Sequence, residues 1–186
     1  MLDKIVGVYI KPEQTMAEEA KKEHNKAFLV AHTFFNAFIL NSFVAAVFLE
    51  VPVLAIFFFL VLSAVTAIAI LAIEFVTHKA AASKGGKGTY WSQLAITNLY
   101  LTPVFLAFVV IAVVAILVFP TSNARMPLDL FVGIMASRMN TKKILAVHAV
   151  KDSLVDIVYG VGMIAAYILW CAIIIAPAVL LGAFGA

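Results

Sequence analysis

The sequence predicts an all-α protein, a polytopic helical bundle that lies in a membrane. Hydrophobic residues make up 65% of the chain and charged residues only 12%, whereas soluble domains carry about 25% charged residues. The chain also holds several apolar runs of about 20 residues or more, which is the length a helix needs to cross a hydrocarbon layer of about 30 Å. We therefore expect a single membrane domain over residues 1–186.

The first two predicted spans form a tight pair. They cover residues 27–49 and 53–77, and only Glu50, Val51 and Pro52 separate them. A connection this short forces the two helices to be antiparallel neighbours. The sequence thus predicts a transmembrane helical hairpin, with the start of the first span and the end of the second on the same side of the membrane.

The second half of the chain is less regular. A third span is predicted over residues 93–119, with Pro103 inside it, and a last span over residues 154–184. Residues 120–153 are mixed, and their longest apolar run is too short to cross, so an interfacial or re-entrant helix is expected there. The predicted fold is four full spans plus this helix, and a five-span alternative, in which residues 128–137 also cross, stays open.

The basic residues bear on orientation. With four spans, eight of the 13 lysines and arginines fall on the side of the N-terminus, and five fall opposite: Arg125, Arg138, Lys142, Lys143 and Lys151. With five spans the split becomes twelve to one. Both counts predict a cytoplasmic N-terminus under the positive-inside rule, and the expected location is the cell membrane. The length of the apolar runs favours four spans, whereas the distribution of basic residues favours five.

The N-terminal segment, residues 1–26, is expected to be a charged, solvated helical segment on the cytoplasmic side. Pro12 suits the first turn of a helix, and we expect that helix to continue to Lys26. No signal-peptide core precedes it, so insertion by the first span is expected. The scattered basic residues favour contacts with anionic membrane lipids and do not indicate nucleic-acid binding. A single cysteine, Cys171, excludes an internal disulfide.

One group of polar residues is expected within the membrane. Because the first two spans are antiparallel, residues at the start of one and at the end of the other should lie at similar depth, joined by a residue of the third span. The predicted cluster is His32, Asn36, Glu74, His78 and Asn98. Interhelical hydrogen bonding is the favoured interpretation. A proton or ion relay and a metal, haem or quinone site remain alternatives.

Two further features lie near the last span: a group of polar residues at its start and a pair of small residues within it. His148, Asp152 and Asp156 follow one another at i,i+4 spacing, which would place like charges on one helix face. They are expected to form either a wet helix start or a contact to an ion or a partner. Gly162 and Ala166 have the small-residue spacing that favours close helix packing. No catalytic triad or metalloprotease spacing is present, and no catalytic residue and no cofactor are predicted.

The first 110 residues or so resemble the Yip-type integral membrane proteins, whose eukaryotic members are linked to Rab GTPases and vesicle traffic. The resemblance is carried by Ile5-Val6-Gly7-Val8, Lys11-Pro12-Glu13-Gln14-Thr15, the span pair, Gly85-Gly86-Lys87-Gly88-Thr89-Tyr90, Tyr100 and Pro103. It implies a bundle of about five spans without known enzymatic activity. The polar stretch from Arg138 to Asp156 departs from the usual fourth span of that family.

The leading functional hypothesis is a non-enzymatic membrane protein that acts as a scaffold or accessory subunit of a larger membrane complex. Its expected partners are membrane lipids, other membrane protein subunits or further copies of itself. Two alternatives stay open: a small oligomeric transporter or channel lined by Glu74 and the histidines, and a redox subunit that holds a cofactor between His32 and His78.

Overall fold

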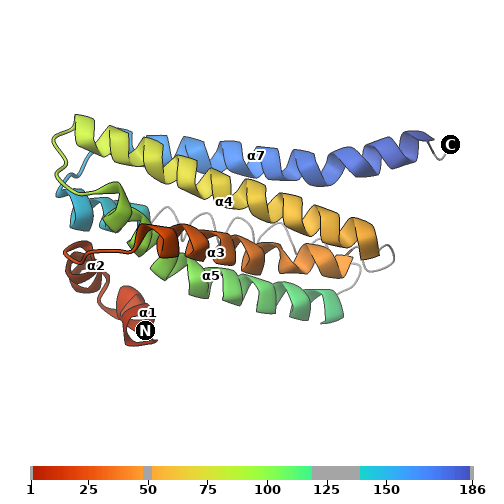
Figure 1. Cartoon of the computed structure of the whole chain (residues 1–186), viewed down its shortest axis with the longest axis horizontal. Coiled ribbons are helices and arrows are strands. Elements are labelled where there is room, and N and C mark those ends of the chain that lie inside the picture. Colours follow the sequence, from red (N-terminus) through yellow and green to blue (C-terminus); the bar gives the residue numbers. More distant parts are fainter. Residues whose placement is uncertain (1, 48–51, 119–138, 185–186) are drawn as a thin grey trace.

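The computed structural model describes residues 2–47, 52–118 and 139–184, and every regular element among them is a helix (Figure 1). In chain order these are α1 (Leu2–Ile10), α2 (Pro12–Ala20), α3 (Lys26–Val47), α4 (Pro52–Ser83), α5 (Tyr90–Val118) and α7 (Ser153–Phe184). Residues 139–148 form one more helix, called here the 139–148 helix. The predicted all-α class is confirmed for the described residues.

Three helices in the described part of the chain are long and apolar enough to cross a membrane. Their candidate spans are Phe59–Ser83 in α4, Tyr90–Ile111 in α5 and Ser153–Ile173 in α7. These helices are those of a membrane protein. The described side chains of α3 end at Ser42, so the prediction of four full spans is not confirmed.

The helices pack around α4. Helix α3 lies between α4 and α5 and contacts both, whereas α7 packs along α4, and the short helices α1 and α2 pack against α5 (Figure 1). The Tyr9 hydroxyl of α1 donates a hydrogen bond of 2.6 Å to the carbonyl oxygen of Tyr100. The Ser92 hydroxyl of α5 donates one of 3.0 Å to the carbonyl oxygen of Ala20 at the end of α2.

Polar segments gather at one end of the bundle. Figure 1 shows α1, α2, the 84–89 loop and the 139–148 helix together there, while the C-terminus lies at the other end. Lys84 of the loop forms an ion pair of 3.4 Å with Asp152, just before α7. We call this end of the molecule the polar end.

The position of the 139–148 helix bears on the predicted orientation. Helices α5 and α7 both start at the polar end, so residues 118 and 139 lie at opposite ends of the bundle (Figure 1). Lys142, Lys143 and Lys151 therefore lie on the side of the N-terminal helices and not opposite them, as four crossings would require. Residues 128–137, which would cross in the five-span alternative, lie outside the described residues. Arg125 and Arg138 lie outside the described residues.

Several helix ends differ from the predicted ones. Helix α2 ends at Ala20 and not at Lys26. Asn25 then caps α3, because its Oδ1 accepts a hydrogen bond of 3.1 Å from the Phe28 N–H. Helix α4 continues to Ser83, past the predicted end at Thr77. Its last turns are rich in alanine, a strong helix former, and Ala81 packs against Ile144 of the 139–148 helix.

Candidate functional site

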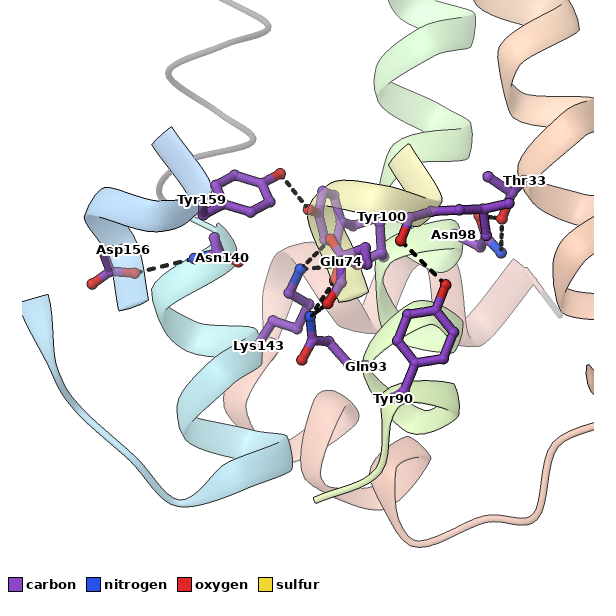
Figure 2. Close-up of polar contacts among 12 residues, drawn as sticks. Thr33, Glu74, Tyr90, Gln93, Asn98, Tyr100, Asn140, Lys143, Asp156 and Tyr159 are labelled. Atoms are coloured by element: carbon purple, nitrogen blue, oxygen red, sulfur yellow. Dashed lines mark hydrogen bonds and ion pairs between the residues drawn. The ribbon is translucent and has the colours of Figure 1, made fainter. Parts of the chain in front are cut away.

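A buried ion pair lies at the centre of the polar end. The Lys143 Nζ atom lies 2.5 Å from Oε1 of Glu74, and both side chains are almost completely buried. The other carboxylate oxygen of Glu74 accepts a hydrogen bond of 2.6 Å from the Gln93 amide nitrogen, which also donates to the Glu74 carbonyl at 2.9 Å. Figure 2 shows the three side chains converging from α4, α5 and the 139–148 helix. Each oxygen of the carboxylate thus has its own donor.

The ammonium group of Lys143 has further neighbours. It donates to the Thr97 hydroxyl at 3.0 Å and lies over the rings of Tyr159 and Tyr100, at 4.9 and 5.9 Å from their centroids. The two tyrosine hydroxyls are 3.2 Å apart (Figure 2). Hydrogen bonds and aromatic faces offset part of the cost of removing the cation from water. The network therefore ties α4, α5, α7 and the 139–148 helix together.

The network continues to two histidines. Because the Gln93 amide nitrogen is committed to Glu74, its oxygen is left to accept, and His148 Nε2 lies 2.8 Å from it. The His148 ring packs against His78 with the centroids 5.2 Å apart. Burial, followed by the neighbouring His78 and Lys143, lowers the pKa of His148 to about 4, so this imidazole is neutral at pH 7.

A second, separate cluster joins α3 to α5. The Asn98 amide nitrogen donates to the Leu29 carbonyl at 2.9 Å, and its oxygen accepts from Thr33 at 3.1 Å and from Asn36 at 3.2 Å. The Thr102 hydroxyl lies 2.7 Å from the Asn36 side-chain oxygen and 3.0 Å from His32 Nε2. These contacts are interhelical hydrogen bonds, the type that holds membrane helices together.

The five residues predicted to form one cluster are thus divided between two. His32, Asn36 and Asn98 belong to the α3–α5 cluster, while Glu74 and His78 belong to the network at the polar end. Successive residues on a helix are about 100° apart, so Thr97 and Asn98 of α5 face different neighbours. The contacts of His32 and His78 with different partners do not support a cofactor held between these two histidines.

Removing the amide of Asn98 should destabilise the bundle. We expect Asn98→Leu, which keeps the branched shape of the side chain, to lower the free energy of unfolding by about 1–3 kcal/mol, since the buried side chains of Thr33 and Asn36 lose their bonds to the Asn98 side-chain oxygen. Denaturant unfolding in detergent micelles measures this loss. The control is Ser42→Ala, whose exposed hydroxyl donates to the Ile39 carbonyl oxygen of the same helix. Equal stability of the two variants would contradict a structural role for the cluster.

His148, Asp152 and Asp156 do not share a helix face. The 139–148 helix ends at His148, Ala149 has a φ of 55°, and α7 starts only at Ser153, so i,i+4 spacing does not apply across this break. Asp152 instead caps α7, accepting from the Leu154 N–H at 2.8 Å. Asp156 accepts from Asn140 and Thr141, at 3.1 and 3.0 Å (Figure 2). The three side chains have three different sets of partners.

The small residues of α7 have different surroundings. A Cβ added to Gly162 would meet the Ile73 side chain of α4 at 3.0 Å, which is tight, so Ile73 packs closely over this glycine. Ala166, one turn further, is half-buried. Close approach at a glycine is the kind of packing that the sequence pattern predicts.

Lys143 and Gln93 are the functional residues that the sequence pattern did not identify. In the sequence, Lys143 is one of the basic residues between two predicted spans, and Gln93 is the first residue of the third predicted span. The only available signal was the need of Glu74, a carboxylate in an apolar run, for a basic partner. Nothing in the sequence pointed to a lysine 69 residues away.

The contacts of Glu74 tie helices together. Each of its two carboxylate oxygens already accepts a hydrogen bond, one from Gln93 and one from Lys143, so an ion would have to compete with these donors or bind beside them. No three histidine, cysteine, aspartate or glutamate side chains lie together as a metal site in the described residues. No model of a known protein family matches the chain, and no curated protein or solved structure matches it either.

Proposed function

We propose that the protein is a non-enzymatic integral membrane protein that acts as a scaffold or accessory subunit of a larger membrane complex, and that it contacts its partner through α7. The observation that carries the proposal is the poor burial of α7 within the chain. Only 11% of its most apolar stretch is buried, against 61% for α5. A helix with so few contacts in its own chain has most of its surface available to another protein.

The exposed surface of α7 has the pattern of a helix-packing face. Ile157, Val161, Ile164 and Ile168 are all more than half exposed and follow one another at spacings of three and four residues. Gly160 lies beside this stripe, and a Cβ added there would meet no atom within 4 Å. An apolar stripe beside a small residue suits close packing against a transmembrane helix, so the partner we propose is an apolar helix of another membrane protein.

Two other observations support this function over transport or redox chemistry. The buried Glu74–Lys143 pair joins two helices, and His32 and His78 contact separate neighbours. The resemblance of residues 1–110 to the Yip-type proteins, which have no known enzymatic activity, points the same way. We further propose that the polar end is cytoplasmic, because the basic residues described for the chain gather there.

Site-specific crosslinking in the native membrane tests the proposed role of α7. A photoreactive amino acid placed at Ile164 should give a discrete crosslinked protein product. The matched control is the same substitution at Ile68 of α4, because Ile164 and Ile68 are 62% and 59% exposed. We expect the yield of the product to be at least fivefold lower at Ile68.

Mass spectrometry of the crosslinked product then separates the outcomes. A foreign membrane protein attached at Ile164 supports an accessory subunit, and a second copy of this chain supports a self-associating scaffold. Lipid adducts alone at both positions, or equal protein yields at both, would refute α7 as a contact surface.

A further inference from the structure

We propose that His78 and His148 form a two-histidine binding site for a divalent transition-metal ion, Zn²⁺ or Cu²⁺, at the polar end of the bundle. The Nδ1 atoms of both rings are buried, and neither has a hydrogen-bond partner in the described part of the chain. His148 is only 1% exposed. A buried imidazole nitrogen with an unused lone pair is costly in a folded protein unless something binds it.

The hydrogen bonds around His148 leave its Nδ1 atom unprotonated and free to bind a metal ion. Glu74 fixes the Gln93 amide nitrogen as a donor, so the Gln93 oxygen accepts, and the proton of His148 must be on Nε2. Its Nδ1 atom then carries the lone pair. Histidines that bind metals commonly donate their other ring N–H to an oxygen acceptor in this way. The Glu74–Gln93–His148 chain therefore prepares His148 as a ligand.

The separation of the two rings fits a shared ion. A metal–nitrogen bond of about 2.0–2.1 Å, with about 1.2 Å from the nitrogen to the ring centre, places each centroid about 3.2 Å from the metal. At a tetrahedral angle the two centroids are then about 5.2 Å apart. The observed centroid distance between His78 and His148 is 5.2 Å, with the ring planes tilted by 43°.

The chemistry of the site selects the ion class. Imidazole nitrogens suit zinc and copper and are poor ligands for magnesium or calcium. No third histidine, cysteine or carboxylate joins the pair among the described residues, so water or a small incoming ligand would complete the coordination. An ion here would link α4 directly to the 139–148 helix.

Metal binding by the full-length protein, purified in detergent with any histidine tag removed, tests the proposal. After dialysis against Zn²⁺, elemental analysis should find about one equivalent, and Cu²⁺ should give an electron paramagnetic resonance signal split by two nitrogens. The His78→Ala and His148→Ala variants should each retain less than a tenth of the metal. His24→Ala is the matched control, because His24 bonds the Glu19 carbonyl away from the site. This variant should bind metal normally.

Gln93→Ala provides an independent readout of the geometry. Loss of the group that orients His148 should weaken metal binding by about 10–100-fold. His78 is half-buried, and among the described residues no hydrogen bond or ion pair joins it to Glu74 or Lys143, so His78→Ala decides the question even if His148→Ala does not fold. Failure to bind either metal, or undiminished binding by His78→Ala, would overturn the proposal.

Discussion

Lys143→Met is expected to lower the free energy of unfolding by about 3–5 kcal/mol, the typical cost of breaking a buried ion pair by removing one partner. The substitution leaves the Glu74 carboxylate buried with Gln93 as its only side-chain donor. Most of this loss in stability comes from burying the unpaired negative charge of Glu74, and a smaller part comes from losing its attraction to Lys143. Denaturant titration in detergent micelles, followed by circular dichroism, measures the change.

The partner substitution should rescue much of this loss. In Lys143→Met combined with Glu74→Gln no charge remains in the network, and replacing a buried pair by neutral groups is often nearly neutral. We therefore expect the double variant to be more stable than Lys143→Met alone. Lys142→Met, at the neighbouring and more exposed position, is the control and should change stability by less than about 0.5 kcal/mol. If the double variant is no more stable than Lys143→Met, the unpaired charge of Glu74 does not cause the loss of stability.

Gly88→Ala is expected to destabilise the protein by about 1–3 kcal/mol, the usual cost of overpacking, or more if the loop cannot move. A Cβ at Gly88 would collide with the carbonyl oxygen and a side-chain methyl of Val147. The same unfolding experiment measures the effect. The glycine is required because the 84–89 loop lies directly against the backbone of the 139–148 helix, and not for any unusual dihedral angle.

Two further variants test the cause of this effect. Gly160→Ala, where the added Cβ meets nothing within 4 Å, should leave the stability unchanged or raise it by up to about 1 kcal/mol, since alanine favours helix. Adding Val147→Ala to Gly88→Ala removes the methyl but keeps the carbonyl, so it should restore stability only in part. Full rescue would assign the collision to the Val147 side chain alone, and no loss in Gly88→Ala would contradict the close contact.

The long apolar helices could be predicted from the sequence, because their hydrophobic runs mark them directly. The long runs correctly placed α4, α5 and α7, and Pro12 correctly marked the start of α2. The predicted helix ends and contacts were wrong mainly at the polar end, where packing between distant segments decides the structure. Helix α4 continues to Ser83 because its last turns pack against the 139–148 helix, a contact that no local pattern contains.

The candidate site could be predicted only by residue type. His32, Asn36, Glu74, His78 and Asn98 are all buried or half-buried and in polar contacts or ring contacts, but antiparallel depth alone could not tell which helix faces they occupy. The division into two clusters follows from the orientation of α5, which only the packed structure defines. Pairing Glu74 with Lys143 required knowing that residues 139–148 lie at the polar end.

The distance along the chain between Glu74 and Lys143 has a consequence for synthesis. The two residues are 69 positions apart, and at about 5–20 residues per second the lysine is made roughly 3–14 s after the glutamate. During that interval the α3–α4 hairpin must wait in or near the bilayer with its carboxylate unpaired or protonated. A chain that ends before residue 143 lacks this lysine, so its Glu74 carboxylate would have no basic partner from the 139–148 helix.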